Sequence, residues 1–319
     1  MHILITGGAG FIGSHLADRL VQGGHRVRIL DNLSTGKIDN LSGPARAAEF
    51  VPGDVRDRVL VGRAVEGVSA VVHLAAVASV QSSMADPLGT HGTNLGGTLH
   101  CLEAAREAQV SRFVYASSAA VYGDHVAPPV DESAPPAPVS PYAIDKLAGE
   151  YYLEHYHRQY GLNTTSFRFF NVYGPRQDAS SPYSGVISRF VECARAGEPC
   201  TVYGDGRQTR DFVYVQDLVD VLVAAVQRDD LAGQVLNVGT GVESDLLSLW
   251  TTLRASIDAP AVPRFLSPRS GDIRRSCART DRLRQGLGFA PRTPLSDGLR
   301  RVAVAETGTD GARDALVAN

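Results

Sequence analysis

The chain has 319 residues, 44% of them hydrophobic, which is enough to bury one large core or two modest ones. Its 31 basic and 34 acidic residues are well mixed and give a net charge of −3, so no basic stripe is visible and no nucleic-acid partner is expected. No apolar run reaches the roughly 18 residues of a membrane span, and no signal peptide is visible, so no membrane partner is expected.

The first half of the sequence alternates short β-branched runs with helix-length segments, a pattern typical of βαβ units and a parallel sheet. Strands are predicted at His2–Thr6, Arg26–Asp31, Glu49–Val51, Ala70–Ala75 and Arg112–Ser117. A helix is predicted over Asn94–Ala108, between the last two strands, because Leu95, Leu99 and Leu102 share one helical face.

The second half is less regular. It contains predicted strands at Thr164–Phe170 and Val235–Val238 and a predicted helix at Val215–Gln227. After Asn171 the sequence becomes richer in Pro, Gly and Arg, as expected of loops that surround a ligand.

These patterns predict two interleaved domains. Residues 1–170 plus about 213–240 would bind a nucleotide, and residues from about 171–212 plus 241–319 would bind the substrate. The last stretch, Glu306–Asn319, is small and polar and is expected to be disordered. The cysteines lack CxxC spacing and are expected to be reduced thiols of a cytoplasmic protein without a metal site: Cys101, Cys193, Cys200 and Cys277.

A glycine cluster, Gly7–Gly13, directly follows the first predicted strand and precedes a helix that starts near Phe11. Glycines there permit a tight turn and a close approach of the backbone to a pyrophosphate, whose charge the helix N-terminus favours. Asp31 ends the second strand, 18 residues past Gly13, about where a carboxylate binds the adenosine ribose. Because a carboxylate would repel the extra phosphate of NADP, NAD is the expected cofactor.

The spacing of Gly7, Gly10 and Gly13 resembles that of the short-chain dehydrogenase/reductase superfamily. The expected fold class is therefore α/β, with a Rossmann doubly wound parallel sheet and a smaller interleaved C-terminal substrate-binding domain.

Other segments extend this resemblance: Asp54-Val55 is similar to the pair beside adenine, and Leu74-Ala75-Ala76 to the loop under the cofactor. Asn94 is similar to the asparagine that ties neighbouring strands together. The resemblance implies an NAD site formed by Gly7, Gly10, Phe11, Ile12, Gly13, Asp31, Asn32, Ser34, Gly36, Asp54, Val55, Leu74, Ala75, Ala76, Asn94, Tyr142, Lys146 and Phe170.

Tyr142 and Lys146 are four residues apart and so share one face of a helix. A free tyrosine has a pKa of about 10, but a nearby ammonium and the positive nicotinamide ring favour phenolate, so the pKa of Tyr142 is expected to fall. Ser118 lies 24 residues before Tyr142, after a predicted strand. The three residues resemble the superfamily's Ser–Tyr–Lys triad, in which Ser118 would relay the proton between a sugar hydroxyl and Tyr142.

Longer segments narrow the resemblance to the UDP-galactose 4-epimerase family, over nearly the whole chain. These segments are Tyr115–Gly123, Ser140–Tyr142, Phe167–Arg176 and Gln208–Val213. The resemblance implies a UDP-sugar substrate, oxidation to a 4-keto sugar, and return of the hydride to the other face. It also implies a homodimer formed through two helices of each subunit, one of them carrying Tyr142.

The same resemblance implies which residues bind the UDP-sugar, in addition to Ser118 and Tyr142. Phe170 would flank the nicotinamide. Uridine would be held by Val186, Thr201 and Tyr203, the diphosphate by Asn171, Arg210 and Arg269, and the ribose by Asp272. Ser276 would lie beside the substituent on sugar carbon 2, where a small residue admits an N-acetyl group. The expected substrates are therefore UDP-N-acetylglucosamine and UDP-N-acetylgalactosamine, and also UDP-glucose and UDP-galactose.

Several residues of this chain differ from the patterns of enzymes with related functions. Sugar-nucleotide 4,6-dehydratases need an Asp-Glu pair directly after the catalytic hydroxyl residue, and UDP-glucuronate decarboxylases need a glutamate at position 120, where this chain has Ala119-Ala120. UDP-glucuronate 4-epimerases resemble a pattern with threonine at 171 and arginine at 178, in place of Asn171 and Asp178 here. A catalytically silent NAD or UDP-sugar sensor usually lacks the tyrosine or the lysine, and both are present.

Overall fold

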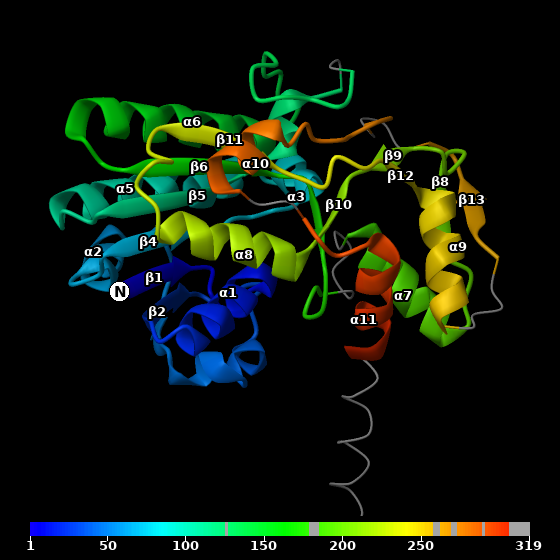
Figure 1. Cartoon of the computed structure of the whole chain (residues 1–319), viewed down its shortest axis with the longest axis horizontal. Helices are drawn as coiled ribbons and strands as arrows, with labels where there is room; N and C mark the ends of the chain where they lie inside the picture. The colour runs from blue at the N-terminus through cyan, green and yellow to red at the C-terminus, as the bar shows by residue number, and fades with distance from the viewer. Residues whose placement is uncertain (125–126, 179–184, 258–261, 269–272, 289–290, 306–319) are drawn as a thin grey trace, which may run out of the picture.

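The computed structural model describes residues 1–124, 127–178, 185–257, 262–268, 273–288 and 291–305. Seven parallel strands form its central sheet in the order β11-β6-β5-β4-β1-β2-β3 (Figure 1). Their bounds are β1 His2–Thr6, β2 Arg26–Asp31, β3 Glu49–Pro52, β4 Ala70–His73, β5 Arg112–Ser118, β6 Thr164–Phe169 and β11 Gln234–Val238. The fold class predicted from the sequence is confirmed, since the sheet is parallel, carries helices and reverses its strand order between β1 and β4.

The two faces of the sheet are buried under separate helices, because side chains alternate along each strand. Ile3 and Ile5 pack with one helical layer, whereas Leu4 between them packs with the other. The first layer contains α1 (Phe11–Gln22) and α8 (Val215–Val226), and the second contains α2 (Arg58–Val65), α5 (Gly97–Glu107) and α6 (Pro141–Tyr160). Both faces of the sheet are therefore buried under helices, as is usual for a parallel sheet.

Shorter helical segments connect these elements. They are η1 Ile38–Leu41, η2 Pro44–Ala47, α3 Val80–Ala85, α4 Pro87–His91, η3 Gly92–Gly96, η4 Ala119–Tyr122 and α10 Asp281–Leu287. Among the described residues, none of the helices combines the length and the apolarity that crossing a membrane requires. All four cysteines are free.

A third hydrophobic cluster lies away from the sheet, in the part of the chain where the sequence predicts the substrate-binding domain. Its helices are α7 Val186–Ala196, α9 Leu246–Ile257 and α11 Leu295–Ala305, which stand together at one end of the molecule (Figure 1). Its short strands are β7 Asn171–Tyr173, β8 Thr201–Tyr203, β9 Thr209–Arg210, β10 Phe212–Tyr214, β12 Ser244–Asp245 and β13 Arg264–Leu266. The predicted domain boundaries remain a proposal, and the predicted disordered tail lies outside the described residues.

Two predicted elements differ from the observed ones near the glycine loop. The strand predicted over Ala70–Ala75 ends at His73, because the chain then crosses Gly7 so closely that a Cβ there would lie 2.8 Å from the Ala75 amide. The helix predicted over Asn94–Ala108 begins with the π-helical turn η3. Within that turn, Asn94 bonds both backbone groups of Val77, at 2.8 and 3.1 Å.

A buried ion pair fixes α6 to the sheet. The Arg168 guanidinium of β6 donates to both carboxylate oxygens of Glu150 in α6, at 2.9 and 2.7 Å, and Ser117 of β5 donates to the same carboxylate. Arg168 also lies 4.7 Å from the ring centroid of Tyr122, whose hydroxyl donates to Asn237 of β11 at 2.7 Å. One helix and three strands therefore share a single polar network, whose charges are satisfied although Glu150 and Arg168 are only 4% and 5% exposed.

The contact between α6 and β5 also depends on Gly149, because a Cβ at that position would overlap the hydroxyl of buried Tyr115. We expect Gly149→Ala to lower the free energy of unfolding by about 1–3 kcal/mol, as overpacked core substitutions do. Urea unfolding followed by circular dichroism measures the change. Gly62→Ala in α2 is the matched control: its Cβ would meet nothing within 4 Å, so it should stabilise the helix by about 0.5–1 kcal/mol. Equal free energies of unfolding for the two variants would contradict the close contact between Gly149 and Tyr115.

Candidate active site

The glycine loop between β1 and α1 leaves no space for side chains. Gly7 has a φ of +70°, and a Cβ on Gly13 would overlap the carbonyl oxygen of Gly7. The loop is tied to the sheet by the Gly7 amide, which donates to the Leu30 carbonyl at 2.8 Å. The backbone at the start of α1 is therefore open to a ligand, and the first-turn amides of the helix favour an anionic group there.

The loop opens into a cleft of about 740 Å³ at the point where the strand order reverses. Most of the predicted cofactor residues line it: Gly7, Gly10, Phe11, Ile12, Gly13, Asp31, Asn32, Ser34, Asp54, Val55, Leu74, Ala75, Ala76, Tyr142, Lys146 and Phe170. Gly36 and Asn94 stand behind this wall. A Cβ on Gly36 would lie 3.0 Å from both carboxylate oxygens of Asp31, and Asn94 holds the loop that contains Val77.

Asp31 is held rigidly at the end of β2. Its carboxylate accepts from the amides of Ala9 and Leu33, at 2.9 and 2.8 Å, and the residue is 7% exposed. Asp54 lies in the same cleft, where its hydrogen bonds and charge interaction with Arg56 lower the pKa of Asp54 to about 2. The glycine cradle with a fixed carboxylate beyond it fits a dinucleotide.

The predicted triad meets on the cleft wall. Ser118 is the last residue of β5 and caps η4, since its hydroxyl accepts from the Ala120 amide at 3.1 Å. Tyr142 and Lys146 lie in the first turns of α6, which Ser140 caps by accepting from the Ala143 amide at 3.2 Å. All three catalytic candidates line the same cleft.

The side chains around Tyr142 do not by themselves lower its pKa. Burial raises the pKa of Tyr142, and its hydrogen bond with Ser118 only partly opposes that shift. Lys146 lies 5.9 Å from the Tyr142 ring centroid and donates to the Ala116 carbonyl at 2.7 Å. A lowered pKa of Tyr142 is therefore not a property of these side chains alone, and it requires the positive charge of the nicotinamide that the prediction also invoked.

One wall of the cleft was missed by the sequence reasoning. Gly89, Thr90 and Thr93, from α4 and η3, line it together with Ser82 and Asp86. The available signal was the Asp86-Pro87 pair, because Asp86 caps α4 by accepting from the Gly89 amide at 3.0 Å, and proline suits the first helical position.

The predicted substrate residues do not share one cleft, unlike most of the predicted cofactor residues. Asn171 lines the main cleft, and Tyr203 lines a second cavity of about 440 Å³. Four others, Val186, Thr201, Arg210 and Ser276, line neither cavity. The Arg210 guanidinium donates to the carbonyls of Thr209 and Ile273, at 2.8 and 2.7 Å. Arg269 and Asp272 lie outside the described residues, although the flanking Pro268 and Ile273 line the second cavity.

The chain is similar to known proteins over almost its whole length. Residues 3–239 match the model of the NAD dependent epimerase/dehydratase family. A UDP-glucose 4-epimerase of Mycolicibacterium smegmatis is 43% identical over 305 residues, which cover 94% of this chain and 97% of that protein. The family description agrees with the NAD cofactor expected from the sequence.

Solved structures show the same architecture. The UDP-glucose 4-epimerase of Thermotoga maritima, solved with UDP-glucose, has a TM-score of 0.93 at 37% identity, covering 97% of this chain and 99% of that chain. A UDP-N-acetylglucosamine 4-epimerase from Methanobrevibacter ruminantium M1, in complex with UDP-N-acetylmuramic acid, has a TM-score of 0.92 at 34% identity. The match covers 97% of this chain and 98% of that chain.

The fixed carboxylate of Asp31 predicts the nucleotide that copurifies with the protein. Denaturing freshly purified protein should release NAD and no NADP, because a second phosphate beside a buried carboxylate is repelled. Chromatography of the released nucleotide against both standards is the measurement. Recovery of NADP as the main species would contradict the role given to Asp31.

Proposed function

Because this chain belongs to the NAD dependent epimerase/dehydratase family, we propose that it inverts carbon 4 of a UDP-hexose. The observation that carries the proposal is the meeting of Ser118, Tyr142 and Lys146 with the glycine loop in one cleft. When bound in this cleft, NAD⁺ would supply the reversible hydride acceptor for carbon 4, so no second substrate would be needed.

The side chains of the cleft move the proton. Tyr142 takes the proton of the sugar's 4-hydroxyl and later returns it to the oxygen, with Ser118 as the relay between them. Lys146 contributes an ammonium that stabilises the phenolate form of Tyr142. Phe170 and Asn171 follow each other along the cleft wall, which suits the proposed contacts with the nicotinamide and with a diphosphate oxygen.

The residues after Ser118 favour an epimerase over a dehydratase or a decarboxylase. Ala119 and Ala120 form the start of η4, directly beside the proposed proton relay. Methyl groups cannot donate or accept a proton, so the acid and base needed for elimination are missing at these two positions. The 4-keto sugar would therefore be reduced again without loss of water or carbon dioxide.

Asp178 is unfavourable for a uronic acid substrate. Its carboxylate lies 3.4 Å from the Lys37 ammonium, at the position where the pattern of UDP-glucuronate 4-epimerases has an arginine. A substrate carboxylate near this residue would lack the positive charge that an arginine supplies, so UDP-glucuronate remains the weaker alternative.

The proposed preference for N-acetylated sugars rests on Ser276. The residue is half-buried, and its neighbours are fixed: Arg275 forms a backbone bridge with Thr209, and the Cys277 carbonyl accepts from the Val130 amide at 2.9 Å. Serine is small enough to leave room for an N-acetyl group on carbon 2. Overall similarity does not favour this preference, since relatives named for UDP-glucose are 43% and 37% identical to this chain and the one named for UDP-N-acetylglucosamine is 34% identical. The proposal therefore depends on local space alone.

We also propose that the protein is a cytoplasmic homodimer. Large apolar side chains of α3, α4 and α6 are exposed on the helical layer that carries Tyr142: Met84, Leu88, Ile144, Tyr151 and Tyr152. Burying such a patch against a second copy would be favourable at about 25 cal/mol per Å². Sedimentation at two protein concentrations distinguishes the dimer from a monomer.

The central experiment is a product assay with UDP-glucose and UDP-N-acetylglucosamine side by side. Formation of the corresponding galacto sugars supports the proposal. Binding of UDP-sugars without turnover of any UDP-hexose would mean a sensor, and a product that has lost water would mean a dehydratase.

The first mutational prediction concerns the base. Tyr142→Phe keeps the ring and removes only the oxygen that takes the proton, so NAD and UDP-sugar binding should be nearly unchanged. The turnover number should fall by about 10²–10⁴-fold, the usual contribution of a general acid–base group. Ser118→Ala should act in the same direction and more mildly, because water can replace the relay. A Tyr142→Phe enzyme that keeps more than about half of its turnover would show that another group is the base.

The second mutational prediction concerns the sugar. Ser276→Tyr should suppress turnover of the N-acetylated pair and spare UDP-glucose and UDP-galactose, because a narrow pocket excludes only the larger substituent. The ratio of kcat/KM for the two sugar types is the measurement. If kcat/KM fell equally for both sugar types, or for neither, Ser276 would not line the sugar pocket.

A further inference from the structure

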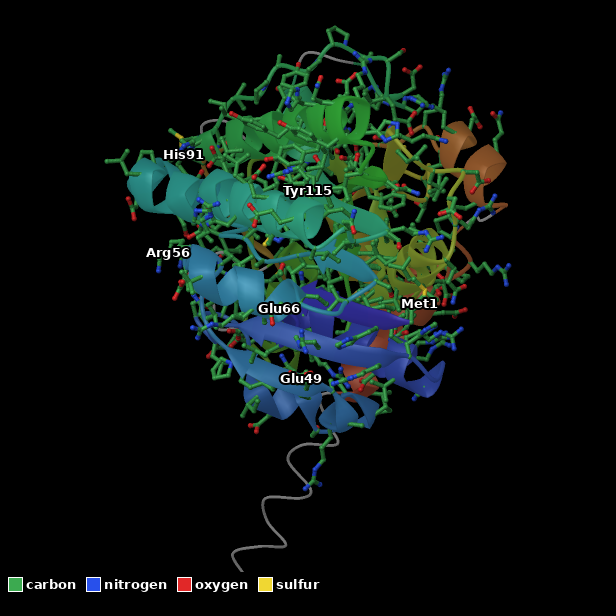
Figure 2. All side chains as sticks on the ribbon, turned by 90° about the vertical axis from the view of Figure 1, so that its left-hand side faces the viewer. Met1, Glu49, Arg56, Glu66, His91 and Tyr115 are labelled. Atoms are coloured by element: carbon green, nitrogen blue, oxygen red, sulfur yellow. The ribbon has the colours of Figure 1, made fainter. Side chains whose placement is uncertain are left out.

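A hydrogen bond connects the missed wall of the cleft to the catalytic helix. Nδ1 of His91, at the end of α4, lies 2.8 Å from Oδ1 of Asp145 in α6. The two side chains differ sharply in exposure, 58% for His91 and 5% for Asp145, and Figure 2 shows His91 at the surface of the molecule. The other carboxylate oxygen, Oδ2, is buried without a hydrogen-bond partner among the described residues. Asp145 is thus a buried carboxylate with a single exposed partner.

Asp145 directly precedes Lys146, which is also buried. The ammonium donates to the neutral Ala116 carbonyl at 2.7 Å and lies 4.9 Å from the centroid of the Tyr115 ring. Burial lowers the pKa of Lys146 to about 8, although the charges of Asp145 and Glu150 oppose that shift. Lys146 therefore depends on negative charge at a distance to remain protonated.

Glu150 is a poor source of that charge, because Arg168 already binds both of its carboxylate oxygens. The other titratable groups that face Lys146 carry no negative charge at neutral pH. Burial raises the pKa of Tyr142 from α6 and of Tyr115 from β5. His73 of β4 is neutral, since burial lowers its pKa to about 3. Asp145 is the carboxylate whose charge is least compensated.

We propose that Asp145 is a positioning residue for the catalytic lysine: its buried carboxylate, held by His91, keeps the Lys146 ammonium protonated and so sets the upper pH limit of the reaction. This inference rests on the proposed function for the role of Lys146. In this proposal, the contact between α4 and α6 holds the Asp145 carboxylate in place as well as packing the two helices together.

The direction of the effect follows from the sign of the charges. Removing the negative charge of Asp145 favours neutral Lys146, so its pKa falls further below the ordinary lysine value. The ammonium then loses its proton at a lower pH, and Tyr142 loses the cation that stabilises its phenolate. The alkaline limb of the kcat profile therefore moves to lower pH, by roughly one unit for the loss of one buried charge from the neighbouring residue.

The chain allows a direct measurement because it contains only two lysines, Lys37 and Lys146. In protein labelled with ¹³C-lysine, the Lys37→Arg background leaves the Cε signal of Lys146 as the sole lysine signal to follow against pH. Asp145→Asn should lower its titration midpoint by roughly one unit. Glu154→Gln is the matched control, since it removes one negative charge from the same helix at an exposed position and should leave the midpoint unchanged.

A second variant guards against failure of Asp145→Asn to fold. His91→Arg, at the exposed end of the pair, places a permanent cation beside Asp145 without adding a lysine, and it should shift the midpoint in the same direction by a smaller amount. The kcat profile of each variant should move with its Lys146 midpoint, while KM stays near the wild-type value.

The outcomes separate the two proposals. An unchanged Lys146 midpoint in both Asp145→Asn and His91→Arg overturns the inference, as does a uniform loss of kcat with an unmoved alkaline limb, which is what a purely structural role predicts. A wild-type protein that turns over no UDP-sugar overturns the proposed function instead. The NMR midpoint still reports on Asp145 in that case, because it needs no substrate.

Discussion

The buried pair of Glu150 and Arg168 sets the position of the catalytic helix. It joins α6 to β6, and the hydrogen bond from Ser117 extends it to β5, one residue before Ser118. Gly149, one residue before Glu150, permits the close approach to Tyr115. Two charges this deeply buried are costly unless both are satisfied, so the pair tolerates only one register of the helix on the sheet. That register brings Tyr142 and Lys146 beside Ser118.

The sequence predicts those parts of the structure that short patterns determine. The glycine loop, Asp31 and the Tyr142–Lys146 spacing depend on residues that are close in sequence, and the structure places all of them on one cleft. The α4 wall was missed although the local Asp86-Pro87 pair marks the start of α4. The π-helical turn at Asn94 and the His91–Asp145 pair were not predictable from short patterns, because they depend on contacts between residues 17 and 54 positions apart. The strand at Ala70 was predicted too long for the same reason, since the close crossing at Gly7 ends it.

The charged residue proposed for binding and the residues proposed for catalysis lie in different electrostatic environments. Asp31 is a carboxylate fixed by backbone amides, so the proposed contact with a ligand would need no movement of this side chain. Tyr142 and Lys146 are instead buried in a region where each is pushed toward its neutral form. A tyrosine of this kind stays a neutral phenol, which cannot take up a proton, until positive charge enters the cleft. Under the proposed function, proton transfer by Tyr142 would therefore depend on the bound cofactor.

The edge position of β11 delays completion of the sheet during synthesis. Until residues 234–238 have left the ribosome, the backbone of β6 is an open edge on the side where β11 pairs. Until α8, which is made just before β11, has emerged, the apolar face that includes Leu16 and Leu20 of α1 also lacks its cover. A nascent chain in this state exposes both features that promote aggregation. The long insertion between β6 and β11 therefore ties the folding of the nucleotide-binding half to segments made much later, because its sheet cannot be complete before residue 238 has emerged.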